Sequence, residues 1–453
     1  MNHEAVSPPF PDYPEFEYLR LEADSLTSSA SVQDPSVRHP ELARTRSALY
    51  VQHYIHDGST ESWEAMTGGQ KDEDRMSYAT FQQLNRLSHV AMPSVEDYQA
   101  VEYVNVIHDI CKNPTIMEDL GLLPGEDSHD EGLRLLFSPE HTAVRQRYLP
   151  SYDTFTEQQK ELIRGVSTVP LNFIRFVQSQ ASGGEIASIA NIPKSVMFAS
   201  IMHGIHDLGG AMGHKDETSS STLDEPAATR LLDAAYALTV KGIEDKERQY
   251  AYASIRANRL GISPDPETGM LSDEALTKLT VADLLRCYSA KDFAAPQAAF
   301  DRLPLPLRQV WSLVHAFPLQ FSEGSRYGEQ QGTEYAPAFL RALGKSQDDL
   351  YLSLGYFAEI RLITDALHIS EAAQQNAEDM PDSSPYTIVN FYDLARSFSK
   401  RAEEIKAARR ILLRLSISNH TITPKLADAE DRWDGVYVQS LSHPDVYRLP
   451  DLS

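Results

Sequence analysis

Apolar residues recur along this chain at the three-to-four-residue spacing of an α-helix, and this spacing constrains the fold more than any other feature. In residues 156–180 the apolar positions fall on one broad helical face. The same pattern returns in 226–257, 272–289, 337–343, 349–367 and 387–416. Alternation of apolar and polar residues is scarce, and only 436–438 suggests a strand. The sequence therefore predicts an all-α fold.

The helical pattern is interrupted often enough to indicate more than one domain. A chain of 453 residues is long enough for two or three packed units. Stretches rich in Gly, Ser, Pro or acidic residues separate the helices at 214–222, 261–269, 322–334 and 374–385. We place one boundary between residues 222 and 265. We expect an N-terminal tail (1–39), a helical domain (40–240), a second helical domain (241–420) and a C-terminal tail (421–453).

Charge and composition exclude several classes of protein. The 41 basic and 65 acidic residues give a formal charge of −24, and such a surface repels the phosphate backbone of nucleic acids. We therefore expect no general nucleic-acid binding. No apolar run approaches the ~18 residues of a membrane span, and the first residues lack a secretion signal. With two cysteines in the chain, we expect a cytoplasmic protein without a disulfide framework.

Histidines are concentrated in one segment, where several precede an aspartate. Nine of the 15 histidines lie between positions 53 and 214, and His56, His108, His129 and His206 are each followed by Asp. A neutral imidazole beside a carboxylate offers two ligand atoms that suit Fe, Mn, Zn or Mg. The segment therefore predicts a site for one or two divalent metal ions.

The most informative stretch is AVEYVNVIHDICKNP, which begins at Ala100. Its apolar positions form a stripe that would carry His108 and Asp109 into the interior, where burial costs free energy unless a partner satisfies the pair. The letters HDICK resemble the HDIGK-type signature of the HD-domain superfamily of α-helical metal-dependent phosphohydrolases, with Cys111 where Gly is commoner. The resemblance extends over about residues 40–240 and implies an HD-domain-like helical bundle.

This resemblance implies roles for particular residues. His108 and Asp109 would bind metal, and Lys112 would contact phosphate, which makes Lys112 and Asp109 the expected catalytic residues. In the family an earlier His and a distant Asp complete the metal site. Asp207 is the candidate for the distant Asp. For the earlier His we prefer His56, followed by His53 and then His89.

Further ligands would come from two other segments that resemble parts of the family pattern. His129 is expected to head a helix with an apolar face, as does the His that binds a second metal ion in some members. In the later helix VMFASIMHGIHDLGGAMG, His203 lies four residues before Asp207 and three before His206, so these positions are close on the helix surface. His203 or His206 would help to hold the second ion, although His206 points about 100° away from Asp207.

A rival register also fits the sequence. His206 and Asp207 could be the dyad themselves, because HDLGG resembles HDLGK. Asp283 or Asp365 would then be the terminal carboxylate, and Gly210 would stand where the family has Lys.

These observations favour a hydrolase of a phosphate ester, in a nucleotide or a related small phosphate. The metal would activate a water molecule for attack on the ester. Two alternatives remain open at this point. One is a di-iron oxygenase on the same scaffold. The other is a non-catalytic helical interaction protein, in which remnant His-Asp pairs are hydrogen-bonded couples in the core.

Overall fold

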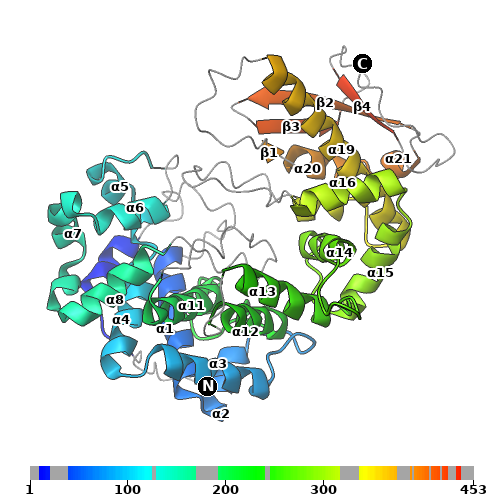
Figure 1. Ribbon diagram of the computed structural model, residues 1–453. Helices are drawn as coiled ribbons and strands as arrows, with labels where there is room; N and C mark the ends of the chain where they lie inside the picture. Colours follow the sequence, from blue (N-terminus) through cyan, green and yellow to red (C-terminus); the bar gives the residue numbers. More distant parts are fainter. Residues whose placement is uncertain are drawn as a thin grey trace. The chain divides into compact units, whose positions relative to one another are not determined.

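The computed structural model contains two compact units, which we describe separately (Figure 1). Unit 1 comprises Met1–Val177 and Glu185–Gln249, and unit 2 comprises Gln178–Gly184 and Tyr250–Ser453. This division falls inside the stretch 222–265 that the sequence indicates. The structure describes residues 10–20, 39–124, 129–169, 192–239, 245–316, 336–374, 388–389, 392–407, 410–418, 421–426 and 435–439.

Unit 1 is built from α-helices joined by short 3-10 turns. Its α-helices are α1 (Pro40–Asp57), α2 (Thr60–Thr67), α3 (Tyr78–Ala91), α4 (Val95–Ile107), α5 (Pro114–Asp119), α6 (His129–Leu136), α7 (Thr142–Tyr148), α8 (Glu157–Ser167), α11 (Lys194–Gly210) and α12 (Glu225–Thr239). Its 3-10 turns are η1 (Pro14–Leu19), η3 (Ile110–Lys112), η4 (Pro139–His141) and η5 (Pro150–Thr154). Helix α13 (Asp245–Arg259) crosses the division, so the expected single helix over 226–257 is two helices.

Local sequence explains where these helices begin and end. Ser94 caps α4 by accepting a hydrogen bond from the Asp97 amide, and Thr156 forms a reciprocal capping box with Gln159 at the start of α8. Helix α1 ends at Gly58, whose φ of +70° is the left-handed conformation that glycine adopts most easily. Within the expected helix 156–180, α8 ends at Ser167, and residues 170–180 lie outside the described part.

Part of the expected N-terminal tail belongs to the core of unit 1. Glu15 is fully buried in η1, where its carboxylate accepts hydrogen bonds from the Tyr103 hydroxyl (2.8 Å) and from the Ser151 amide and hydroxyl (2.9 and 2.8 Å). A buried carboxylate with three donors is well satisfied. The expectation of a separate tail is therefore wrong for residues 10–20, which tie α4 to η5.

Helices α1 and α11 approach each other closely, and glycines make the approach possible. A Cβ added at Gly210 would lie 2.6 Å from the Ala48 nitrogen and 2.7 Å from the Arg44 carbonyl oxygen, both backbone atoms of α1. At Gly209 it would lie 2.8 Å from Val51 Cγ1. The absence of side chains at these positions lets the two backbones pack directly, which fixes the end of α11 against α1.

Unit 2 consists of helices and one sheet. Its helices are α14 (Asp273–Leu284), α15 (Ala290–Asp301), α16 (Leu305–Ala316), α18 (Ala336–Leu340), α19 (Gln347–Gln374), α20 (Tyr392–Lys400) and α21 (Ala402–Ala407). They enclose an aromatic core in which Trp311 stacks on Phe357 with ring centroids 4.7 Å apart. The Trp311 indole donates a hydrogen bond to the Leu354 carbonyl (3.2 Å), so its one polar group is satisfied in the core.

The sheet of unit 2 has four strands in the order β1-β3-β2-β4. They are β1 (Ile388–Val389), β2 (Arg410–Ser418), β3 (Thr421–Leu426) and β4 (Gly435–Gln439). Strand β2 pairs antiparallel with β3 and β4, whereas β1 pairs parallel with β3. The strand expected at 436–438 is confirmed. The helix expected over 387–416 is wrong for the residues of β1 and β2, and the expected tail 421–453 contains β3 and β4. The predominantly helical class of the chain is confirmed.

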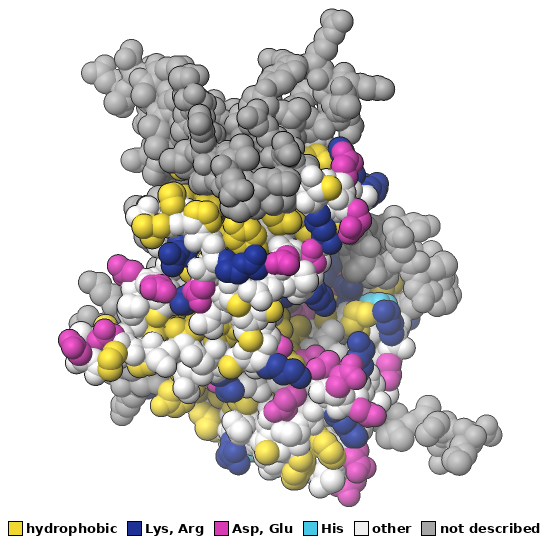
Figure 2. Space-filling model, turned by 90° about the vertical axis from the view of Figure 1, so that its right-hand side faces the viewer, with side chains coloured by type: hydrophobic (Ala, Val, Ile, Leu, Met, Phe, Trp, Pro, Cys, Tyr) yellow, Lys and Arg dark blue, Asp and Glu magenta, His cyan; other side chains and the backbone are white. Residues whose placement is uncertain are grey.

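On the face in Figure 2, acidic and basic side chains are interspersed instead of forming a broad basic surface. No helix among the described residues is long and apolar enough to cross a membrane.

Helix α19 carries a buried carboxylate for which the described part of the chain provides no hydrogen-bond donor. Glu359 is fully buried, and both of its carboxylate oxygens lack a partner there. Burial in apolar surroundings raises its pKa to about 9, because the charged form is poorly solvated. Glu359 is therefore protonated near neutral pH.

Replacing Gly210 with Ala should destabilise unit 1 and loosen the α1–α11 contact. We expect a loss of about 1–3 kcal/mol, because the new Cβ must displace backbone atoms of α1. Gly68→Ala is the matched control, since its Cβ would meet atoms no nearer than 3.4 Å. Hydrogen exchange of α1 and α11 amides measures the effect, and equal protection in the two variants would contradict it.

Replacing Glu359 with Gln should stabilise unit 2 increasingly as the pH rises. The folded chain keeps a proton that the unfolded chain releases near pH 4.5, so stability falls between about pH 4.5 and pH 9. The neutral amide avoids this loss, and we expect a gain of about 1–3 kcal/mol at pH 8 and a smaller one at pH 5. Hydrogen exchange of α19 amides at the two pH values tests this, with exposed Glu267→Gln as control. A gain independent of pH would contradict the explanation.

Candidate metal centre

The end of helix α4 and the last turns of helix α11 bring together the residues that the sequence singles out. The stripe of α4 is buried as expected, with Val101, Val104 and Ile107 at most 1% exposed. The helix ends at Ile107, and His108 and Asp109 form the turn into η3, at the inner end of the stripe. Asp207 projects from α11 towards them.

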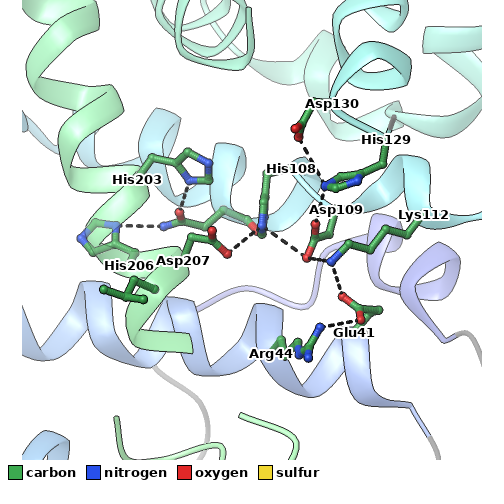
Figure 3. A network of polar contacts seen from close by, with 12 residues as sticks. Glu41, Arg44, His108, Asp109, Lys112, His129, Asp130, His203, His206 and Asp207 are labelled. Carbon is green, nitrogen blue, oxygen red and sulfur yellow. Dashed lines mark hydrogen bonds and ion pairs between the residues drawn. The ribbon is translucent and has the colours of Figure 1, made fainter. Parts of the chain in front are cut away.

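His108, Asp109 and Asp207 form one compact cluster (Figure 3). His108 Nε2 lies 2.9 Å from Asp207 Oδ1 and 3.3 Å from Asp109 Oδ2. One ligand atom from each residue lies within 4.8 Å of the others. Among the described residues, no other set of three or more His, Cys, Asp or Glu side chains meets this condition. The expected convergence of His108, Asp109 and Asp207 is therefore present in unit 1.

The orientation of His108 leaves Nε2 directed at two carboxylates. Its Nδ1 lies 3.2 Å from the Asn105 carbonyl oxygen. Because a carbonyl only accepts, Nδ1 carries a proton and donates it. The remaining nitrogen, Nε2, lies beside two carboxylates. This contact is favourable only if Nε2 carries a second proton or binds a cation. Histidines that bind metals in proteins are held in this way, with the other ring nitrogen donating to a carbonyl or carboxylate.

The electrostatics of the cluster depend on these charges. Burial opposes the charged form of His108, but Asp109 and Asp207 outweigh burial and raise its pKa to about 10. Burial also opposes ionised Asp109, yet His108 and Lys112 hold the pKa of that carboxyl well below its usual value. His108 likewise lowers the pKa of Asp207 against the effect of burial. Both carboxylates are therefore ionised at neutral pH and available to a cation.

Lys112 joins this cluster to α1. Its Nζ lies 2.8 Å from Asp109 Oδ2 and 2.8 Å from Glu41 Oε2, and Arg44 contacts the other oxygen of Glu41 at 2.9 Å. Glu41 is 1% exposed, so its charge is buried between two cations. Two of the three Lys112 donors are thus directed at carboxylates. The phosphate contact predicted for Lys112 stays a prediction, and the side chain first serves to hold Asp109 ionised.

Two further histidines of α11 lie beside the cluster but differ in their partners. His203 Nδ1 is 2.7 Å from Asn105 Oδ1, and the His203 ring lies 5.0 Å from that of His108. His206 is fully buried, and its Nδ1 is 3.1 Å from Asn105 Nδ2. His206 faces Asn105 instead of the cluster, because consecutive helical residues point about 100° apart. The prediction that His206 binds metal beside Asp207 is therefore wrong in this structure.

The structure places the expected first histidine elsewhere. His56 Nδ1 lies 3.0 Å from Ser88 Oγ, and its ring contacts those of His89 and Tyr98. The ring nitrogens of His56 are not among the ligand atoms that lie within 4.8 Å of one another in the cluster. The preference for His56 is therefore wrong. His53 and His89 are also outside the cluster, since His53 contacts Tyr54 and exposed His89 contacts His56.

His129 and Cys111 lie next to the cluster. His129 begins helix α6 as expected, and its Nε2 lies 3.5 Å from Asp109 Oδ1 and 3.3 Å from Asp130 Oδ1. It therefore contacts Asp109 from the side opposite His203 (Figure 3). Cys111 is buried, and burial raises the pKa of its thiol, so it is a packed side chain without nucleophilic character.

The rival register is not favoured by these contacts. Asp207 faces His108, whereas the neighbouring His206 faces away from Asp207. Asp283 belongs to unit 2, where it pairs with Arg256 at 2.8 Å. The side chain of Asp365 lies outside the described part. Asp207 thus contacts His108 from a separate helix and does not pair with the neighbouring His206.

Three polar residues of the site escaped the sequence analysis. Glu41 bridges Lys112 and Arg44, and Asn105 and Gln52 bond to each other at 2.7 Å in the core. The available signal was a polar residue within an apolar stripe: Asn105 stands between Val104 and Val106 and precedes His108 by one turn. Buried polar groups of this kind require partners, and the partners of Asn105 are Gln52, His203 and His206.

The fold and the site define a predominantly helical protein with a candidate metal centre in unit 1. A model described as a family of unknown function (DUF6829) matches residues 21–351, which is more than half of the chain and includes every residue of this site. The chain belongs to that family. No curated protein and no solved structure matches the chain.

Replacing Glu41 with Gln should strongly destabilise unit 1. The change removes the charge that lies between Lys112 and Arg44, and a buried ion pair that loses one partner typically costs about 3–5 kcal/mol. Hydrogen exchange of α1 amides measures the loss, with exposed Glu61→Gln in α2 as the matched control. An unchanged stability of Glu41→Gln would show that the network contributes little to unit 1.

Proposed function

We propose that unit 1 is an HD-type metal-dependent phosphohydrolase that acts on a phosphate ester of a nucleotide or a related small phosphate. The observation that carries this proposal is the convergence of His108, Asp109 and Asp207 from two helices on one point. The resemblance to HD domains implies that His108, Asp109 and Asp207 hold one metal ion together with His56, and His56 lies outside the cluster.

The donor set fits a divalent cation such as Mn²⁺, Fe²⁺, Mg²⁺ or Zn²⁺. One imidazole nitrogen and two carboxylate groups are ligands of the type these ions prefer. His108 is oriented by the Asn105 carbonyl, and Asp109 is oriented by the Lys112 ammonium group. Such outer contacts accompany metal ligands in proteins and hold them in place. A bound divalent ion supplies Lewis acidity, which polarises the phosphoryl oxygen and makes coordinated water more acidic.

The residues around the cluster support the handling of a phosphate ester. Lys112 places a positive charge beside Asp109, where it would offset negative charge that develops on the phosphoryl group. His129 adds an imidazole that contacts Asp109 from α6 and would recruit a second ion. The acidic character of the whole chain does not oppose this, because the local charge of the site decides the binding of a small anion.

A second candidate function is a non-catalytic helical interaction protein. One observation favours it: if His108 is protonated, its charge and those of Lys112 and Arg44 balance Asp109, Asp207 and Glu41. The network is then neutral without a metal ion, and the His-Asp contacts are structural ion pairs. Metal binding decides between the two candidates, since a cation must replace the proton on His108 Nε2.

His108→Gln and Asp207→Asn should each weaken metal binding while the chain stays folded. We expect Mn²⁺ affinity, measured by titration calorimetry on chelator-treated protein, to fall more than 10-fold in either variant, because each loses one ligand atom. His89→Gln removes an exposed histidine outside the cluster and should bind Mn²⁺ like the wild type.

Hydrolysis of p-nitrophenyl phosphate and of a panel of nucleotides should follow the same order among these variants. Circular dichroism checks that each variant is folded. If His108→Gln retains as much metal as the parent, the cluster is not a metal centre and the interaction protein becomes the better description.

A further inference from the structure

A chain of three amide and carbonyl groups leads from the backbone of α4 to His203. The Gln52 side chain donates from Nε2 to the Tyr98 carbonyl oxygen at 3.1 Å. Gln52 Oε1 lies 2.7 Å from Asn105 Nδ2, and Asn105 Oδ1 lies 2.7 Å from His203 Nδ1. Gln52 and Asn105 are both fully buried, so water does not compete for these contacts.

The carbonyl at the start of this chain fixes the direction of every later hydrogen bond. Because the Tyr98 oxygen can only accept, the Gln52 amide group must face it and leave Oε1 towards Asn105. Asn105 must then present its amide group to Gln52 and its oxygen to His203. An oxygen acceptor requires a proton on His203 Nδ1, so the lone pair of neutral His203 is on Nε2.

The same amide group of Asn105 favours the opposite tautomer of His206, in which the proton is on Nε2. Its second hydrogen is directed at His206 Nδ1, 3.1 Å away, so this nitrogen accepts and Nε2 carries the proton. His206 Nε2 is buried and has no hydrogen-bond partner among the described residues. One asparagine therefore favours different tautomers in two histidines of one helix. The acceptor nitrogen of His203 is Nε2, which remains free, whereas the acceptor nitrogen of His206 is Nδ1, which already accepts from Asn105.

His203 lies close to the cluster without belonging to its ligand group. It precedes Asp207 by one helical turn, and its ring makes an edge-to-face contact with His108. It is not among the residues whose ligand atoms are all within 4.8 Å of one another. In Figure 3, His203 lies on one side of His108 while Lys112 and Glu41 lie on the other. This position suits a hydrogen bond to a water molecule at the cluster better than a direct bond to a cation.

We propose that His203 orients the attacking water through Nε2. Asn105 and Gln52 are positioning residues that keep His203 in the tautomer with the proton on Nδ1. This inference rests on the proposed hydrolase function and extends it. It gives the two histidines of α11 different roles. It also gives a reason for a buried asparagine and glutamine in a core where apolar side chains would cost less free energy.

The tautomer of each histidine is measurable without metal or substrate. Long-range ¹H–¹⁵N correlation spectra of the full chain, labelled on histidine, report which ring nitrogen carries the proton. His203→Gln and His206→Gln assign the two signals. We expect His203 protonated on Nδ1 and His206 protonated on Nε2. A wild-type spectrum with His203 protonated on Nε2 would overturn the proposal, whatever the activity.

Two substitutions at Asn105 separate its contacts. Asn105→Asp keeps an oxygen acceptor for His203 but removes the donors to His206 and to Gln52, so His203 should keep its tautomer and His206 should move its proton to Nδ1. Asn105→Leu removes all three side-chain contacts, so His203 should also change, with loss of the Nδ1 proton signal. Identical spectra for the two variants would contradict the assigned direction of the hydrogen bonds. Hydrogen exchange of α4 and α11 checks that both variants are folded.

Activity measurements then test whether His203 orients the water. With Mn²⁺ and p-nitrophenyl phosphate, we expect kcat of Asn105→Leu to fall about 10–100-fold with KM and Mn²⁺ affinity within about twofold of wild type. Asn105→Asp should retain more activity than Asn105→Leu. If Asn105→Leu changes the form of His203 and kcat is unchanged, the water-orienting role is wrong while the hydrolase remains. If the wild type neither binds Mn²⁺ nor hydrolyses any phosphate ester tested, both proposals fail.

Discussion

The contact between His108 and the two carboxylates governs the arrangement of unit 1. Asp109 and Asp207 come from segments about 100 residues apart and are brought within reach of one imidazole nitrogen. Two ionised carboxylates in the interior repel each other and are poorly solvated, so they require positive charge between them. A proton on His108 or a divalent cation can provide that charge. Lys112 contacts Asp109, and Glu41 is buried between Lys112 and Arg44.

Close packing of two helices makes this contact possible. Gly209 and Gly210 let α11 lie directly on α1, and one turn earlier Asp207 faces the end of α4. On the same face of α11, one turn before Asp207, His203 meets Asn105 of α4. The site is therefore the meeting point of three helices whose backbones are held by packing. Side chains on rigid elements keep the geometry that either metal binding or a structural ion pair requires.

The sequence predicted the helical elements better than the sheet. Capping residues such as Ser94 and apolar stripes such as that of α4 act within a few residues, so the sequence displays them directly. Residues 410–418 form a short apolar run that fits either a helix or a strand. Their pairing with 421–426 and 435–439 makes them a strand, and pairing between separate segments is not visible in local periodicity.

The sequence by itself determined that the chain is mainly helical, that His108 and Asp109 lie at the inner end of a buried helix, and that His203 and Asp207 share one helical face. These properties follow from local spacing, which repeats every 3.6 residues. Only the tertiary structure decided that Asp207 meets the dyad, that His56 contacts Ser88 instead of the cluster, and that Asn105 separates the roles of His203 and His206. These outcomes depend on how helices cross, and helix crossing is set by side chains distant in the sequence.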